Sequence, residues 1–285
     1  MLRSVNRFKL GDEGYIFAVF GDVRYLKYAI ASISTLRRYD TERPVAILCE
    51  KHHKDLLEEQ GLDKQVDHIR LLDPDHASIV GFKHNLHNYL LFENNLILDS
   101  DIVFCKDPGP LWQMLKAHPY TITGRLVSDN FFGASKDLKV VWDMLFQRRR
   151  RTLKRFGLTY LSRVQSGLIF CRDYNLAKRI GTLAHTFLNK IEDTHFKSRT
   201  KEVGRTEESC EWSLAMAMSK LQVPVFPWHF GHITAQIDYF EEVTEHDPDF
   251  HDVRVLYYND PFIQGLSGIK SKFIRNVLRF LLSPL

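Results

Sequence analysis

The sequence predicts an α/β protein with a mostly parallel central sheet flanked by helices. Within the first hundred residues, apolar runs typical of buried strands alternate four times with helix-like segments. Alternation of this kind implies parallel strands joined by crossover helices. The chain has 285 residues, of which 44% are hydrophobic, and this suffices for one large α/β domain with a sizeable core.

The expected elements follow one another in a regular order. Short runs rich in apolar and β-branched residues predict strands, and apolar residues at three- and four-residue spacing predict helices, the first with Asp22 as its N-cap. The expected strands are Tyr15–Phe20, Pro44–Cys49, Val66–Leu72, Leu96–Leu98 and Gly167–Cys171. The expected helices are Val23–Arg38, Lys51–Gln60, Lys83–Leu91, Tyr174–Leu188 and Glu207–Leu221. A loop is expected over 198–208, and a loop or a solvated helix over 238–252.

The cysteines and the charge balance limit the cellular setting. The four cysteines lie far apart and form no Cys-x-x-Cys pair, which argues against a zinc ribbon or a disulfide scaffold. The start of the chain has no apolar secretory segment. We therefore expect a reduced, cytoplasmic protein. The net charge of +4 comes from the last 25 residues, so the body is neutral and no nucleic-acid partner is expected.

The C-terminal segment differs from the rest of the chain. We expect one domain over residues 1–260 and a basic amphipathic segment over 261–285. A helix over 268–285 would gather apolar side chains on one side and most of its cations on the other. Such a helix suits the surface of an anionic membrane, and the alternative is packing on the body. The apolar residues are Ile269, Phe273, Ile274, Val277, Leu278 and Leu281, and the cations are Lys270, Lys272, Arg275 and Arg279.

One Asp-x-Asp motif of three is bracketed by apolar residues on both sides. Asp99-Ser100-Asp101 follows an expected strand, at the sheet edge where parallel α/β proteins bind ligands. Two carboxylates at the edge of a hydrophobic core repel each other. A divalent cation between them makes the arrangement tolerable. Hard oxygen ligands suit Mg²⁺ or Mn²⁺, with phosphate oxygens completing the shell. The alternative is a solvated turn, which is the expectation for the motifs at 73–75 and 247–249.

The segment Phe92–Val103 resembles the metal-binding signature of nucleotide-sugar glycosyltransferases of the GT-A fold. It is most similar to glycosyltransferase family 8, the group of lipopolysaccharide galactosyl- and glucosyltransferases and glycogenin. Four further segments agree with this family in order and spacing, so that the resemblance covers about residues 14–225. They are Phe17–Leu26, Lys83, Gln165–Phe170 and Glu207–Glu211.

The resemblance implies a role for each of these segments. Asp22 and Tyr25 would bind the nucleotide base, and Lys83 the diphosphate. Asp99, Ser100 and Asp101 would bind the donor together with Mn²⁺ or Mg²⁺, the two aspartates being the metal ligands. Gln165, Glu208 and Glu211 would act at the donor sugar and the acceptor. Base binding by Asp22 is compatible with helix capping, while Lys83, Glu208 and Glu211 have the alternative of being ordinary helix residues.

The implied activity is transfer of a hexose from a nucleoside diphosphate sugar, a UDP-sugar, to a glycan or glycolipid with retention of configuration. If the segment 268–285 binds a membrane, we expect a peripheral position on its cytoplasmic face and a lipid-linked or lipopolysaccharide-type acceptor, and hence a role in lipopolysaccharide or polysaccharide biosynthesis. The sequence departs from the family at two places. Gln165 replaces an asparagine, and Tyr257 stands where a third, histidine metal ligand is expected, with His229 and His232 as rival positions.

Two other functions remain open from the sequence. A haloacid dehalogenase-type phosphohydrolase also has an apolar strand before Asp-x-Asp, with Asp99 as nucleophile and Asp101 as acid/base. A non-catalytic scaffold on the same fold is the other alternative. Two histidine pairs, His52-His53 and His84 with His87, lack a further ligand in the sequence pattern and are expected to be structural. The run 148–155 has six cations in eight residues and suggests an anionic partner.

Overall fold

The structure, a computed structural model, describes residues 10–125, 146–201, 206–227 and 233–239. Its centre is a seven-stranded sheet with the strand order β3-β2-β1-β4-β7-β6-β8. All neighbouring strands pair in parallel except at β7, which is antiparallel to both β4 and β6. The predicted class, a mostly parallel sheet flanked by helices, is confirmed. The strands are β1 (Glu13–Val19), β2 (Val45–Cys49), β3 (His68–Leu71), β4 (Asn94–Leu98), β6 (Tyr120–Arg125), β7 (Arg163–Cys171) and β8 (Phe226–Pro227).

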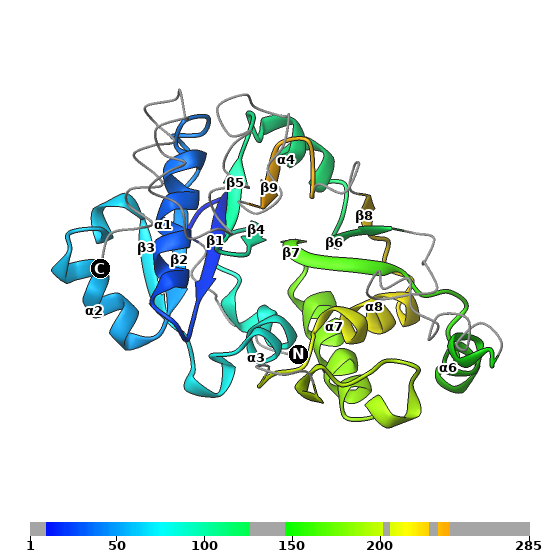
Figure 1. Ribbon diagram of the computed structural model, residues 1–285. Coiled ribbons are helices and arrows are strands. Elements are labelled where there is room, and N and C mark those ends of the chain that lie inside the picture. The colour runs from blue at the N-terminus through cyan, green and yellow to red at the C-terminus, as the bar shows by residue number, and fades with distance from the viewer. Residues whose placement is uncertain (1–9, 126–145, 202–205, 228–232, 240–285) are drawn as a thin grey trace, which may run out of the picture.

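Helices cover both faces of this sheet (Figure 1). One face packs against α1, α4 and a two-stranded sheet of β5 and β9, and the other packs against α3, α7 and α8. The helices are α1 (Arg24–Leu36), α2 (Lys51–Glu59), α3 (Ile79–His84), α4 (Gly109–Leu115), α6 (Arg148–Phe156), α7 (Tyr174–Leu188) and α8 (Glu211–Lys220). The small sheet joins β5 (Ile102–Phe104) to β9 (Ile237–Tyr239).

The two faces of the central sheet carry two separate apolar cores because side chains alternate along each strand. In β1, Tyr15, Phe17 and Val19 point to the α1 side, while Ile16 points to the α3 side. All four side chains are fully buried. The strands of this sheet therefore read as near-continuous apolar runs in the sequence, as expected for strands buried on both faces.

The expected helix over Lys83–Leu91 is wrong in its bounds. The α3 helix begins at Ile79, where the Ser78 hydroxyl caps it by accepting a hydrogen bond from the Gly81 amide, and it ends at His84. Asn85 interrupts the helix because its side-chain amide donates to the Gly81 carbonyl oxygen at 2.9 Å. A 3-10 turn over Leu86–Tyr89 follows.

Two further expectations differ from the structure. Val23, and not Asp22, is the N-cap of α1, although an Asp22 carboxylate oxygen still accepts a hydrogen bond from the Arg24 amide at 2.9 Å. The segment 238–252, expected as a loop or a solvated helix, begins instead with a strand, since Asp238 and Tyr239 belong to β9 and pair with β5. The other residues of that segment, the division at residue 260 and the expected helix over 268–285 lie outside the described residues.

Candidate active site

A solvent-open cleft lies at the carboxyl ends of β1 and β4, next to the beginning of β7. Its volume is about 470 Å³. The antiparallel β7 brings its first residues to this edge, because Leu168 pairs with Leu98 and the Asp99 amide donates to the Gly167 carbonyl oxygen at 2.9 Å. Seven residues predicted from the sequence line the cleft. They are Tyr25, Lys83, Asp99, Ser100, Asp101, Glu208 and Glu211.

Lys83 is the buried cation of this cleft. Its side chain is only 3% exposed, and its ammonium group lies 2.8 Å from an Asp99 carboxylate oxygen. The same nitrogen donates to the Ser166 hydroxyl at 2.9 Å and to the Ser166 carbonyl oxygen at 3.0 Å. Three acceptors thus satisfy the three donors of the ammonium group. Burial acts to lower the pKa of Lys83, but nearby negative groups, Asp99 foremost, outweigh it and raise that pKa above its ordinary value.

Asp99 and Asp101 fit a divalent cation of the hard class. Both line the cleft from the turn between β4 and β5, and the Asp99 side chain is 31% exposed toward it. Lys83 contacts one of the two Asp99 carboxylate oxygens and leaves the other available. Mg²⁺ is commonly held by one or two carboxylates together with substrate phosphates, and Asp99 and Asp101 supply the carboxylates of such a set. The proposed third ligands His229, His232 and Tyr257 lie outside the described residues.

Glu211 is held at the inner wall of the cleft by a backbone contact. It is the first residue of α8, and its carboxylate accepts a hydrogen bond from the Ser166 amide at 3.1 Å. Burial raises the pKa of Glu211, and the Ser166 amide and Lys83 only partly offset this effect. Cys210 lies beside it with its thiol 3.6 Å from the Ser166 hydroxyl, and burial raises the pKa of that thiol to about 11. The thiol is therefore a neutral neighbour.

Gln165 lies behind the cleft lining. Its side-chain oxygen accepts from the Gly167 amide at 2.9 Å, and its side-chain nitrogen donates to the hydroxyl of Tyr239. A side chain at position 167 would overlap the Tyr239 hydroxyl, so glycine is required there by close approach. Burial, with Asp99 and Asp101 nearby, raises the pKa of Tyr239 well above its ordinary value. The phenol consequently stays protonated and able to donate.

Glu208 lines the cleft and forms hydrogen bonds with Ser198 and Arg199. Its carboxylate accepts hydrogen bonds from the Ser198 hydroxyl and from the Arg199 amide, the latter at 3.0 Å. Arg199 itself lines the cleft, as does Glu207, whose carboxylate accepts from the Ile79 amide at 3.1 Å. Glu208 therefore positions Arg199, a role that sequence reasoning did not assign to it.

Tyr25 and Asp22 lie at the outer edge of the cleft, after β1. Tyr25 is 37% exposed and lines the cleft together with Phe20 and Gly21. Asp22 does not line it, and its carboxylate faces the Arg24 guanidinium at 3.8 Å. Gly21 has a positive φ of 76°, which glycine adopts without strain.

The sequence did not single out Arg199 and Tyr239 as site residues. Arg199 follows no motif and reaches the cleft through a 3-10 turn, Arg199–Lys201. Tyr239 arrives through the pairing of β9 with β5, in which it lies opposite Ile102. This pairing joins segments that are far apart in the sequence, so no local signal points to Tyr239.

Other predicted clusters are not brought into the cleft. His84 is buried, its ring lies 3.0 Å from the Ser213 hydroxyl, and burial lowers its pKa to about 4, so it is a neutral structural residue. The basic run forms α6, in which Arg155 pairs with Asp193 at 2.7 Å. All four cysteines are buried and make no disulfide. Among the described helices, none is long and apolar enough to cross a membrane.

Family models and curated proteins gave no match to this chain. The chain is similar to the galactosyltransferase LgtC in complex with donor and acceptor sugar analogues, at 14% identity and TM-score 0.43, over 65% of this chain and 66% of that one. Mouse xyloside xylosyltransferase 1 in its apo form matches at 11% identity and TM-score 0.46, over 75% and 85%. A 4-diphosphocytidyl-2C-methyl-D-erythritol synthase from Anaerococcus prevotii matches at 12% identity and TM-score 0.41, over 89% and 99%.

This chain thus spans just under two thirds of the LgtC chain. All three TM-scores lie below 0.5.

Proposed function

We propose that this protein transfers a hexose from a nucleoside diphosphate sugar, a UDP-sugar, to a glycan or glycolipid acceptor. The observation that carries the proposal is the convergence of Asp99, Asp101 and the buried ammonium group of Lys83 in one open cleft at the carboxyl edge of the sheet. Burying a cation beside two carboxylates costs desolvation free energy. A diphosphate would interact with the cation, and its metal counter-ion with the carboxylates, which gives this arrangement a function.

The chemistry of the donor explains why these charges belong together. The diphosphate is the leaving group, and it gains negative charge as the bond to the sugar breaks. Mn²⁺ or Mg²⁺ bound by Asp99 and Asp101 would stabilise this charge. Lys83 is fixed by Asp99 and Ser166, so its positive charge needs no reorganisation when the diphosphate leaves. Ser100 lies between the two aspartates and would contact the donor from the same turn.

The remaining residues suit the base, the sugar and the acceptor. Tyr25 presents a half-exposed ring at the cleft edge on which a base can stack, and Asp22 lies beside it to accept from the base. Glu211 and Glu208 offer carboxylate oxygens to sugar hydroxyls from the opposite wall. Gln165 would act through Tyr239 and the Gly167 amide, and it therefore positions the wall of the sugar pocket. Retention of configuration is part of the proposal.

A thermal-shift screen tests the proposal directly. The full chain would be heated with UDP, GDP, CDP, ADP and their common sugars, with and without Mn²⁺ or Mg²⁺. A ligand that binds only the folded state stabilises it by mass action, by about 2.7 kcal/mol at 100 times its Kd, and thereby raises the Tm. We expect a metal-dependent shift with UDP or UDP-sugars that is absent in the Asp99→Asn/Asp101→Asn variant.

The matched control is Asp73→Asn/Asp75→Asn. It changes an Asp-x-Asp of identical spacing that forms a surface turn, and asparagine can still accept the hydrogen bond from the amide of residue 75. This control should keep the full nucleotide shift. Absence of any nucleotide shift in the wild-type chain would refute the transferase, and an equal shift in both double variants would refute the assigned ligands. Where the shift is found, NMR of the anomeric proton of the product tests retention.

The phosphohydrolase alternative makes a different prediction. It requires Asp99 to form an aspartyl phosphate, and an Asp99 oxygen contacts Lys83 instead of standing free. Trapping of a phosphorylated Asp99 after incubation with a phosphate ester would favour this alternative. Metal-dependent nucleotide binding without hydrolysis or transfer of the sugar would favour the non-catalytic scaffold.

Attachment to the cytoplasmic face of a membrane is a separate part of the proposal. It rests on the composition of residues 268–285, which lie outside the described residues. Flotation with anionic vesicles should carry the full chain, and a chain ending at residue 260 should stay behind. Equal flotation of both would contradict the assignment of this segment as the anchor. A lipopolysaccharide or polysaccharide acceptor follows if the anchor is correct.

A further inference from the structure

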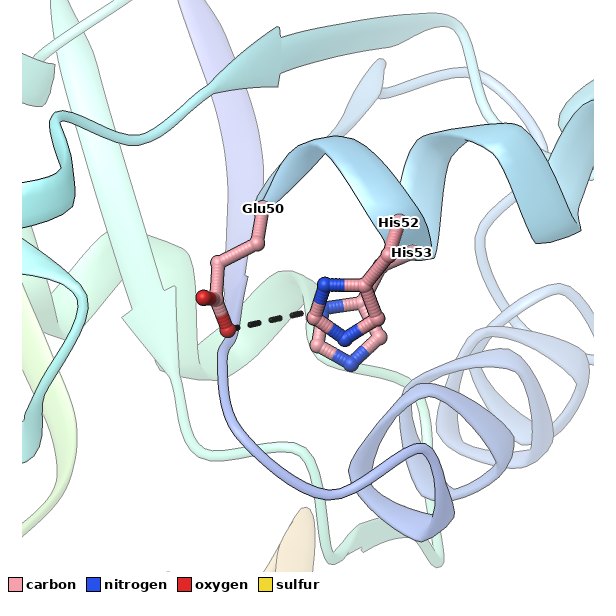
Figure 2. Close-up of side chains that lie close together, drawn as sticks. All are labelled: Glu50, His52 and His53. Carbon is pink, nitrogen blue, oxygen red and sulfur yellow. Dashed lines mark ion pairs between the residues drawn. The ribbon is translucent and has the colours of Figure 1, made fainter.

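A second cluster of metal-binding side chains lies at the end of β2, outside the residues used above. Glu50 directly precedes α2, and His52 and His53 belong to the first turn of that helix. Figure 2 shows the three side chains converging on one side of the helix start, with the two imidazole rings overlapping. One potential ligand atom from each side chain lies within 4.8 Å of the others. Among the described residues, this is the only group of three or more such side chains that meets this spacing.

His53 is the residue that needs an explanation. It is fully buried, and neither of its ring nitrogens makes a hydrogen bond of good geometry, although the backbone of Gly21 and Asp22 lies close to the ring. A buried polar group without a partner costs free energy, and each such group in a folded protein calls for a reason. Burial lowers the pKa of His53 and the neighbouring His52 acts in the same direction, while Glu50 and the backbone of Gly21 and Asp22 oppose it.

A purely structural role accounts for Glu50 alone. Its carboxylate accepts a hydrogen bond from the Gly21 amide at 2.6 Å, which fixes the turn after β1. That contact gives nothing to His53, whose Nδ1 lies 4.0 Å from the same carboxylate oxygen. It also leaves unexplained why His52 lies against His53, with ring centroids 3.8 Å apart.

The spacing suits one small ion after modest side-chain movement. Ligand atoms bound to zinc at about 2.1 Å in a tetrahedral site lie about 3.4 Å apart. The spacing observed here, within 4.8 Å, exceeds this by up to about 1.4 Å. His52 is exposed and Glu50 half-exposed, so both side chains can rotate to close the difference while His53 stays fixed in the core.

We propose that Glu50, His52 and His53 form a binding site for a divalent transition-metal ion of the zinc class, with water as the fourth ligand. Two imidazoles and one carboxylate favour this class over Mg²⁺, which prefers oxygen ligands alone. The site is thus distinct in its chemistry from the Asp99/Asp101 pair. It adjoins the cleft through Gly21, which contacts Glu50 and lines the cleft edge.

The test measures metal binding by the untagged full chain, stripped with a chelator and then freed of it. Titration calorimetry with Zn²⁺ should show one ion per chain, and Co²⁺ at the same site should show the visible d–d absorption of a four-coordinate Co²⁺ ion. We expect His52→Gln and Glu50→Gln each to weaken zinc binding at least tenfold, since loss of even an outer partner of a metal ligand costs about 10- to 100-fold. Glu50→Gln keeps an acceptor for the Gly21 amide, so a purely structural role of Glu50 would leave binding unchanged.

Two controls keep the outcome decisive. His185→Gln removes an exposed histidine on α7 and should bind zinc as the wild type does. Asp99→Asn/Asp101→Asn should also keep the zinc site, and its result is independent of whether the chain transfers sugars. His53→Gln changes a core residue. If that variant fails to fold, the zinc titration of His52→Gln decides the outcome, because His52 is exposed. The proposal is overturned if no zinc binds, if His52→Gln binds as tightly as the wild type, or if zinc is lost with Asp99 and Asp101.

Discussion

Replacing Lys83 by methionine should destabilise the protein mainly through its partner Asp99. The two charged atoms lie 2.8 Å apart, and Coulomb's law gives about 6 kcal/mol of attraction at an effective dielectric constant of 20. Burial of an ammonium group that is 3% exposed offsets much of this gain. Fully buried pairs lose about 3–5 kcal/mol when one partner is removed, whereas exposed pairs contribute up to about 1 kcal/mol.

The Lys83–Asp99 pair lies between these limits because the Asp99 side chain is 31% exposed and can regain water. We therefore expect a coupling free energy of about 2 kcal/mol in a double-mutant cycle of Lys83→Met and Asp99→Asn. The assay is urea unfolding of the four proteins without added metal or nucleotide. Lys83→Met alone should lower the Tm by about 4–8 °C.

The matched control is the surface pair Lys51 and Asp55, whose charged atoms also lie 2.8 Å apart. Its lysine side chain is 77% exposed, so the same cycle with Lys51→Met and Asp55→Asn should give a coupling close to the error of measurement. Equal coupling in the two cycles would refute the reasoning, because it would mean that burial of Lys83 does not strengthen the pair.

Three further predictions concern the pH dependence and packing of the domain. The pKa of Glu211 is raised by burial, so its ionisation costs stability as the pH rises above 4.5, and Glu211→Gln should remove this loss in a series of Tm measurements from pH 4 to 8. Burial lowers the pKa of His84 from 6.5 to about 4, so the stability that neutral His84 provides above pH 6.5 is lost as the pH falls toward 4. Over that range the free energy of unfolding, measured with urea, should fall by about 3 kcal/mol less in His84→Gln than in the wild type. Gly181→Ala places a methyl group against the His84 backbone carbonyl, and the overlap should outweigh the gain of about 1 kcal/mol in helix propensity, lowering the Tm by several degrees.

Each of these has a control on the same element or residue type. Glu207→Gln changes an exposed carboxylate near Glu211 and should leave the pH profile as it is, so an equal effect of both changes would contradict the role of burial. His68→Gln should keep the acid sensitivity that His84→Gln removes. Thr182→Ala adds alanine to α7 at an exposed position, and a Tm loss there equal to that of Gly181→Ala would refute the packing argument.

The layered α/β class and most of its elements are predictable from the sequence. Strands such as β1, β2 and β4 are buried on both faces, so they appear as apolar runs that periodicity finds. The Asp-x-Asp motif was recognisable because the strands β4 and β5 bracket it with apolar residues. Lys83 and Glu211 were expected at the site from the resemblance of their segments to the glycosyltransferase family, and both line the cleft together with that motif.

Only the tertiary structure decided which distant groups meet in the cleft. Lys83 reaches Ser166 across 83 residues, and Gln165 reaches Tyr239 across 74, because β7 inserts antiparallel beside β4 and β9 pairs with β5. Local propensity carries no information on strand order, so no reading of the sequence could place Tyr239 or Arg199 at the site. The same holds for His53, whose sequence pattern looks like an ordinary helix start. His53 is buried because the turn at Gly21 packs over the start of α2. The contact that holds this turn, from the Gly21 amide to the Glu50 carboxylate, joins residues 29 positions apart in the sequence.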